Sequence, residues 1–314
     1  MQLDDVAVKA ELSAQTSGDA FHERQILQHA WLTLTPDKET HFESILTAPL
    51  ASLHQLMCLA LGRRVPCVRL DVQTPRTAVM NIAGGRPFLP ASKIFFSQKR
   101  VLPLPDREHP MSFLFTLTGA GDLRKSVSQW HLGFNAFRSS LDFYFSLDTE
   151  SDSNVATEHH FLSSINAFES YHRAVGKKQF DLPEADHQLR LVQALERTPP
   201  EHREWLKAKL EYSNEVSMRS RLKQLYDEQP DSVARLLGNK SQFVGTIINT
   251  RNYLIHHSPA LESAALTGLP LWLATRKLRL AIQICFLRQM GLSDDAISEM
   301  IPRSRDYRVL RFYS

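Results

Sequence analysis

The strongest constraint on this chain is a change of pattern near residue 118. Beyond it, apolar residues recur every three or four positions in successive segments that Gly, Pro and polar turns separate. Each such segment is an amphipathic helix that must bury one face, and six or seven of them in sequence predict an all-α bundle. The sequence therefore predicts an α+β fold: a small mixed sheet-and-helix domain at residues 1–118, a helical linker at 119–154 and a helical bundle at 155–314.

Short apolar or alternating runs indicate strands in the first part of the chain. Between the first two runs, a stretch with helical spacing stops at Gly62. Five prolines between residues 84 and 110 mark turns between further short strands. We expect strands within residues 29–35, 65–73, 77–84, 93–98 and 112–117, and a helix that begins near residue 50.

The second part is nearly all helix. The polar stretch "DTESDSN" at 148–154 marks the expected boundary between the linker and the bundle. One later segment opens with a capping-box pattern, Thr198 to Glu201, and has Pro199 at its first helical position. The helical segments cover residues 122–147, 156–176, 183–197, 198–215, 217–228, 231–238, 241–258 and 269–291.

Composition narrows the class of protein. Of the 314 residues, 43% are hydrophobic and 23% are charged, as in ordinary soluble globular proteins. The three cysteines form no CxxC pair and are too few for a disulfide framework, which fits a reducing compartment. The first residues carry acids without an apolar core segment, so no signal peptide is expected, and no run approaches the roughly 18 apolar residues of a membrane helix. We expect a cytoplasmic protein with no membrane partner.

Positive charge is concentrated toward the end of the chain. The formal net charge is only +3, but residues 240–314 hold ten Lys or Arg and five acidic residues. A basic region of this kind is compatible with a polyanionic partner. A solvated face with scattered arginines explains the same counts equally well, so charge alone does not decide.

The stretch "NTRNYLIHHSP" at 249–259 breaks the pattern of an ordinary core helix. An apolar stripe through Val244, Ile247 and Ile248 would next reach position 251, where the chain has an arginine. Ser258 precedes a proline and therefore avoids the α region, so we expect the helix to end near residue 257. Two histidines then occupy its last turn, where the negative end of the helix dipole favours imidazolium.

Arg251 and His256 are the candidate chemical groups of this stretch. Five steps of roughly 100° place them about 140° apart around an ideal helix, so one chain alone would form a poor two-residue site. Two copies that meet across a two-fold axis could bring both pairs into one cleft. RNA carries its own nucleophile, the 2′-hydroxyl, so cleavage needs only a general base, an acid and cations for the charged phosphorane. Arg, Asn and His within six residues also arise by chance, and a histidine near a helix end is commonly only a cap.

These residues resemble a known family. "RNYLIH" matches the R-N-x-x-x-H form of the Rx4–6H motif of HEPN domains, helical bundles that are often metal-independent ribonucleases. Together with "FLSSINAFESYHR" and "LKAKLEYSNEVSMRSRLKQLYDE", it makes residues 155–290 look like the Apea-like HEPN family. Members of that family occur in bacterial antiphage defence, where RNA cleavage halts the infected cell. The resemblance implies an RNA substrate, a homodimer through the HEPN bundle, a phage-derived or protein trigger, and neither a metal nor a cofactor.

Carried over residue by residue, the resemblance implies Arg251 and His256 as catalytic, with Asn252 in support. His257 is the alternative histidine, because its spacing also lies within the range of the motif. "FESYHR" adds Glu169 and His172 as part of a frequently seen signature in the first helix of the family. As a metal pair, Glu-x-x-His is weak without a second copy. A structural role, in which Glu169 or His172 hydrogen-bonds Arg251, is the favoured interpretation.

The end of the chain supports two interpretations. A helix, an "MGLS" turn and a second helix capped by Ser293 resemble a helix-turn-helix with a basic tail. A basic rim that binds RNA phosphates explains the same arginines, Arg303, Arg305, Arg308 and Arg311. Our leading hypothesis is a HEPN endoribonuclease whose first domain senses a trigger or regulates access. The alternative is a non-catalytic HEPN module that binds nucleotide, RNA or a partner protein.

Overall fold

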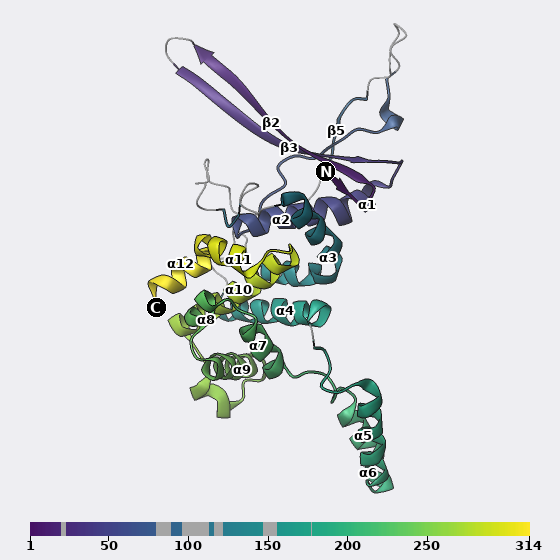
Figure 1. Cartoon of the computed structure of the whole chain (residues 1–314), viewed down its shortest axis with the longest axis vertical. Coiled ribbons are helices and arrows are strands. Elements are labelled where there is room, and N and C mark those ends of the chain that lie inside the picture. Colours follow the sequence, from purple (N-terminus) through teal and green to yellow (C-terminus); the bar gives the residue numbers. More distant parts are fainter. Residues whose placement is uncertain (20–22, 80–88, 96–112, 116–121, 147–155, 177) are drawn as a thin grey trace.

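The computed structural model of the protein describes residues 1–19, 23–79, 89–95, 113–115, 122–146, 156–176 and 178–314. A small antiparallel sheet near the N-terminus precedes a body of packed helices (Figure 1). The predicted α+β class is confirmed. One apolar core runs through the molecule, from Leu3 in the sheet to Leu310 in the last helix.

A long β-hairpin projects from one end of the helical body (Figure 1). It is formed by β2 (Val6–Asp19) and β3 (Glu23–Pro36), and β1 (Gln2–Leu3) pairs with the base of β2. The strand expected at 29–35 is confirmed within β3. Its partner β2 was not predicted, although "VKAEL" at 8–12 alternates apolar and polar residues as a half-buried strand does.

The base of the hairpin is fixed to the helices by a line of three side chains. Nε2 of His131 lies 3.0 Å from Oδ2 of Asp4, and Nδ1 of the same ring lies 2.8 Å from Oγ of Ser52. His131 and Ser52 are buried, and Asp4 has a positive φ of 49° in the turn between β1 and β2. The turn that starts the hairpin is therefore tied directly to two helices.

The other expected strands are mostly wrong where the structure describes them. Of residues 65–73, only β4 (Asp71–Val72) is a strand, paired with β5 (Ser92–Lys93). Pro66 lacks an N–H for a ladder, and Pro75 begins the short 3-10 helix η2 (Pro75–Thr77) soon after β4. Residues 113–115 are not in a strand. Residues 80–84, 96–98, 112, 116 and 117 of the expected strands lie outside the described residues.

One continuous helical run follows the hairpin. It consists of α1 (Phe42–Ile45), the π-helical turn η1 (Leu46–Leu50) and α2 (Ala51–Leu61), and Gly62 ends it in the left-handed region with φ +66°. By length and composition, this run is the one helix among the described residues that would suffice to cross a membrane, with a mean hydropathy of 1.5. One such helix is weak evidence for a membrane span, because a core helix of a soluble protein passes the same test. In this helix, 33% of the window is buried.

Helix α3 (Leu123–Tyr144) lies at the centre of the molecule and packs on both α2 and α4 (Thr157–Val175). Trp130 and Phe137 of α3 are fully buried, and the Trp130 indole donates a hydrogen bond to the carbonyl of Ser52. The segment expected to act as a linker is thus a core helix. The expected boundary at 148–154 lies outside the described residues, and the domain limits stay a prediction.

Two helices form a second projection, at the other end of the body (Figure 1). They are α5 (Glu184–Glu196) and α6 (Pro200–Leu210). The expected capping box of α6 is wrong, because Pro199 is the N-cap and the Thr198 hydroxyl donates to the Ala194 carbonyl of the preceding helix instead. The remaining helices are α7 (Met218–Asp227), α8 (Asp231–Leu237), α9 (Lys240–His256), the 3-10 helix η5 (Pro259–Ala264), α10 (Gly268–Gln289), α11 (Asp294–Met300), the 3-10 helix η6 (Ile301–Arg303) and α12 (Arg305–Phe312). Of these, α7, α9 and α10 pack on α4, whereas α8 and α12 pack on α10.

Candidate active site on helix α9

Helix α9 buries one stripe against its neighbours and leaves the opposite side open. The stripe consists of Phe243, Val244, Ile247 and Thr250. Oγ1 of Thr250 accepts a hydrogen bond from the backbone N–H of Leu266 at 3.1 Å. The sequence placed position 251 next on this stripe, and that expectation is wrong. The stripe follows the i, i+4, i+7 pattern from Phe243 to Thr250 and leaves Arg251 on its flank.

Arg251 is half-buried and has no acidic partner among the described residues. Its Nη1 donates a hydrogen bond to the amide oxygen of Asn252 at 3.1 Å. Its Nε is buried and makes no hydrogen bond within the part of the chain that the structure describes. No carboxylate among the described residues pairs with this guanidinium. A flat cation with unused donors is suited to phosphate oxygens, which it can bind through two parallel hydrogen bonds.

The two histidines differ in backbone conformation and surroundings. His256 is the last residue of α9 and is exposed. His257 is the C-cap, with a positive φ of 48°, and its backbone N–H donates to the Tyr253 carbonyl at 2.7 Å. Its ring lies edge-on to the Tyr253 ring, with centroids 5.9 Å apart. The helix therefore ends where the residue before Pro259 requires it to end, as predicted.

Arg251 and His256 do not form a two-residue site within one chain. Helix α9 is a continuous α-helix over both positions, so their side chains leave its axis about 140° apart. Asn252 and His256 are four residues apart and share one face of the helix. The structure thus brings Asn252 beside both groups without bringing the two groups together.

Glu169 and His172 do not hydrogen-bond Arg251, so the expected pairing is wrong. Both lie on α4, and Oε1 of Glu169 accepts hydrogen bonds from Arg173 at 3.2 Å. His172 is buried between two side chains of α7: Nδ1 is 2.8 Å from Nη1 of Arg221 and Nε2 is 3.0 Å from Oε1 of Gln224. No group of three or more His, Cys, Asp or Glu residues that could hold a metal ion occurs within the described ranges.

Arg221 is a buried residue that the sequence reasoning missed. Its side chain is 3% exposed, and it donates to the Val216 carbonyl at 2.9 Å and to Oε1 of Gln179 at 3.3 Å. Burial lowers the pKa of the Arg221 guanidinium and also that of His172. A signal was present, because Met218, Leu222 and Leu225 flank position 221 at helical spacing on one stripe. Arg221 joins α7 to α4, to the segment that follows α4 and to the segment that precedes α7.

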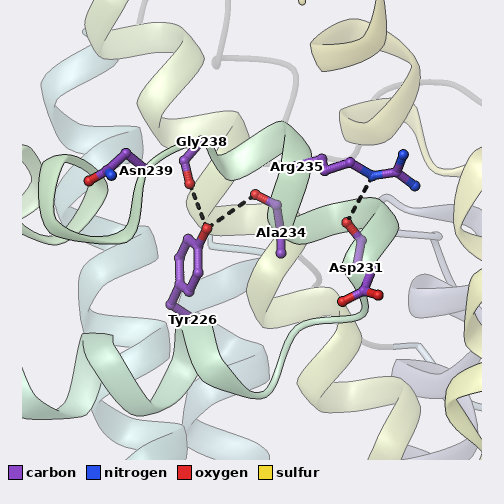
Figure 2. Close-up of a pocket in the computed structure, with 6 residues that line it drawn as sticks. All are labelled: Tyr226, Asp231, Ala234, Arg235, Gly238 and Asn239. Carbon is purple, nitrogen blue, oxygen red and sulfur yellow. Dashed lines mark hydrogen bonds between the residues drawn. The ribbon is translucent and has the colours of Figure 1, made fainter.

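A surface depression lies at the other end of α9. It has a volume of about 640 Å³ and is lined by the end of α7, by α8 and by the N-cap of α9 (Figure 2). The Tyr226 hydroxyl points to the carbonyls of Gly238 and Ala234, at 2.5 and 3.4 Å, and Arg235 donates to the Asp231 carbonyl. About 18 Å of helix separates Asn239 from Arg251. The Tyr226 hydroxyl joins α7 to α8, and the Arg235 and Asn239 side chains form hydrogen bonds within their own helices, so these polar groups are occupied in structural contacts.

The last helices carry the arginines expected to bind RNA. Arg303 is half-buried in η6, and α12 exposes the other three, Arg305, Arg308 and Arg311. Helix α11 is capped by Ser293, as predicted, since its Oγ accepts from the Ala296 N–H at 3.3 Å. However, α11 has only seven residues, and it exposes Asp294, Asp295 and Glu299. Acidic side chains on the outer face are unfavourable for a recognition helix against DNA phosphates.

Comparison with known proteins identifies the helical part of the chain. Residues 162–296 match the family model of the Apea-like HEPN domain, a segment that runs from α4 into α11 and contains both "FESYHR" and "RNYLIH". Neither the search of curated proteins nor the search of solved structures gave a match. HEPN domains belong to a superfamily of nucleases and RNA-binding modules. The segment from residue 162 to residue 296 is an Apea-like HEPN domain.

Proposed function

We propose that the protein is a metal-independent endoribonuclease of the HEPN type. In this proposal, Arg251 and His256 are catalytic, Asn252 supports them, and the active cleft forms where two copies of α9 meet. The observation that carries the proposal is the state of Arg251, a half-buried guanidinium that has no acidic partner among the described residues and hydrogen-bonds only the neighbouring Asn252. By contrast, Arg221, a structural arginine of the same bundle, donates hydrogen bonds to other groups of the protein.

The proposed reaction uses the 2′-hydroxyl of RNA as the nucleophile. A general base removes the proton of this hydroxyl, the 2′-oxygen bonds to phosphorus, and the bond from phosphorus to the 5′-oxygen breaks. A general acid gives the leaving 5′-oxygen its proton, so the products are a 2′,3′-cyclic phosphate and a 5′-hydroxyl. An imidazole can serve as base or acid near neutral pH. A two-fold site offers one His256 from each copy, and Arg251 stabilises the negative charge of the phosphorane.

The open side of α9 supports a dimer through this helix. Ile255 is 44% exposed on it, and His256 and Asn252 are close by. A side chain added at Gly245, two turns earlier, would meet no atom within 4 Å, so a second helix can approach closely there. An isologous contact would place each Arg251 opposite the partner copy, which removes the need for both groups to point the same way from one helix.

The match to the Apea-like HEPN family supports a proposal for the cellular setting. We propose a cytoplasmic protein of antiphage defence or a toxin, in which RNA cleavage stops growth after a phage-derived or protein trigger. The part of the chain before α3 would then sense the trigger or control access to the cleft. The long β2–β3 hairpin is suited to such contact, because it projects away from the helices (Figure 1).

The test is an RNA cleavage assay in EDTA. Purified protein is incubated with total cellular RNA beside the double variant Arg251→Ala/His256→Ala and the control variant Arg219→Ala, which changes an exposed arginine on α7. We expect fragments that end in 2′,3′-cyclic phosphate from the native and control proteins, and none from the double variant.

Cleavage that survives in a folded, dimeric double variant would contradict the proposed residues. If no protein cleaves, the assay is repeated with lysate from phage-infected cells, which supplies a trigger. Failure there, with RNA binding retained, would favour the alternative of a non-catalytic HEPN binding module.

A further inference from the structure

Three aromatic side chains cluster at the surface where α12 ends beside the start of α10. The Phe312 side chain is 82% exposed and that of Tyr313 is 51% exposed. The Tyr313 ring lies edge-on to the ring of Trp272, with centroids 6.1 Å apart, and edge-on to that of Phe312 at 5.2 Å. The Arg276 guanidinium lies over the Trp272 ring at 5.1 Å. Trp272 is half-buried, so Phe312 and Tyr313 supply the exposed rings of the cluster. Large exposed rings grouped in this way mark an interaction site.

Positive charge surrounds this cluster. Arg305, Arg308 and Arg311 of α12 are exposed, and none is within ion-pair distance of a carboxylate in the described part of the chain. The acid of α12, Asp306, is buried and already pairs with Arg276 at 2.8 Å, so it does not neutralise the exposed arginines. We call this surface, formed by Trp272, Arg305, Arg308, Arg311, Phe312 and Tyr313, the aromatic–arginine surface.

A further arginine from the first part of the chain lies close to α12. Burial is the main cause of the lowered pKa of Arg63, and the charge of Arg305 is the second. The Arg63 guanidinium, in the turn after α2, thus senses the positive charge of Arg305 on α12.

The aromatic–arginine surface is connected to the candidate catalytic helix. The hydrogen bond from Leu266 to Thr250 fixes the segment before α10 on α9, next to Arg251. Helix α10 begins at Gly268, Leu269 is 51% exposed, and Trp272 follows one turn later. Two extended residues and four helical ones span at most about 13 Å between Leu266 and Trp272. One bound chain can therefore contact the surface and reach α9.

We propose that the aromatic–arginine surface binds single-stranded RNA, with unpaired bases against Trp272, Phe312 and Tyr313 and phosphates on the arginines of α12. The inference rests on the proposed function, which it deepens by naming the surface that holds the RNA. Bases stack on exposed aromatic rings only when they are free of a duplex, and arginines beside them bind the backbone. A duplex would offer its phosphates but hide the base faces.

The test measures binding without cleavage. The full-length protein is titrated into a fluorescent single-stranded RNA with 2′-O-methyl groups, which removes the nucleophile, and anisotropy gives the affinity. The variants are Phe312→Ala/Tyr313→Ala and Arg308→Glu/Arg311→Glu. The matched controls are Trp205→Ala and Arg190→Glu, which change an exposed aromatic and an exposed arginine on the α5–α6 projection.

We expect each double variant to bind about tenfold more weakly or worse, and each control to bind as the native protein does. The arginine variant should also flatten the dependence of affinity on salt, by about 0.7 in the logarithmic slope per lost phosphate contact. Thermal melting of every variant checks that the fold is kept, since the changed residues are exposed.

Three results would overturn the inference. The first is unchanged affinity for the RNA in both double variants. The second is that the native protein binds a duplex of the same sequence as tightly as the single strand. The third is that the double variants lose binding to phosphatidylserine vesicles, used as an alternative anionic ligand, but keep their binding to RNA. The two proposals fail separately. If the native protein cleaves total RNA but the double variants bind RNA normally, the proposed RNA-binding surface is wrong and the catalytic proposal stands. If the protein never cleaves RNA but the double variants weaken binding as expected, the surface proposal stands and the catalytic proposal is wrong.

Discussion

Nδ1 of His172 accepts a hydrogen bond from Nη1 of Arg221 at 2.8 Å. Because a guanidinium can only donate, the lone pair of Nδ1 must face it, and the proton of the neutral ring lies on Nε2. That proton is donated to Oε1 of Gln224, 3.0 Å away. The contact fixes both the tautomer and the charge of a buried histidine, and it has a consequence for stability.

The first prediction concerns pH. Burial lowers the pKa of His172 below its ordinary value of 6.5, so the unfolded chain binds a proton more readily than the folded one. The free energy of unfolding should therefore be at its full value above pH 6.5 and fall as the pH drops below it. Urea unfolding between pH 5 and 7.5 measures this, and His172→Gln should reduce the slope. An equal slope in both proteins would show that another group is responsible.

The second prediction concerns Arg221 itself. Arg221→Met keeps the length of the side chain but leaves the Val216 carbonyl, Oε1 of Gln179 and Nδ1 of His172 without their donor. We expect a loss of about 2–4 kcal/mol in the free energy of unfolding, measured in urea. Arg219→Ala, an exposed arginine of the same helix, should change it by less than about 0.5 kcal/mol. Similar losses for the two variants would refute the buried role.

The third prediction separates the two histidines of α9. His257 occupies a left-handed C-cap, a conformation that glycine adopts without strain. His257→Gly should preserve RNA cleavage. It should raise the free energy of unfolding by up to about 1 kcal/mol, and the loss of the ring contact with Tyr253 makes this gain smaller. His256→Ala should abolish cleavage and leave stability nearly unchanged, because the side chain is exposed. The reverse pattern in a cleavage assay would assign catalysis to His257.

The fourth prediction concerns the anchor between α9 and α10. Thr250 is fully buried, and Thr250→Val keeps its shape but leaves the Leu266 N–H without an acceptor. We expect a loss of about 1–3 kcal/mol in denaturant unfolding. Thr246→Val, one turn earlier and half-buried, is the control and should have a much smaller effect. If both variants are equally stable, the anchor contributes little.

Local signals in the sequence were sufficient for the helices and for the end of α9. Periodicity located α4, α7 and α10, and the residue before Pro259 set the position of the last turn. The same reasoning failed for strands, because the pairing of strands depends on residues that are distant in sequence. Of the nine residues expected in a strand at 65–73, only the two of β4 form one.

The residues of the candidate site were predictable from the motif, but their burial and their contacts were not. "RNYLIH" named the residues, whereas the burial of Thr250 in place of position 251 depends on where neighbouring helices lie. Likewise, the partner of His172 could not be read locally, since Arg221 is 49 residues away in sequence. Charge on a buried stripe was the available signal for Arg221, and it was overlooked.

The hairpin that leaves the body at Asp4 has a mechanical consequence. Its strands have 14 residues each, or about 46 Å at roughly 3.3 Å per residue. A tilt of about a tenth of a radian at the base would therefore move the far ends of β2 and β3 by roughly 5 Å. Conversely, a force applied to the far ends of these strands acts through that length on the contacts from Asp4 through His131 to Ser52. A small force at a distant contact thus becomes a large one on the start of α2 and on the interior of α3.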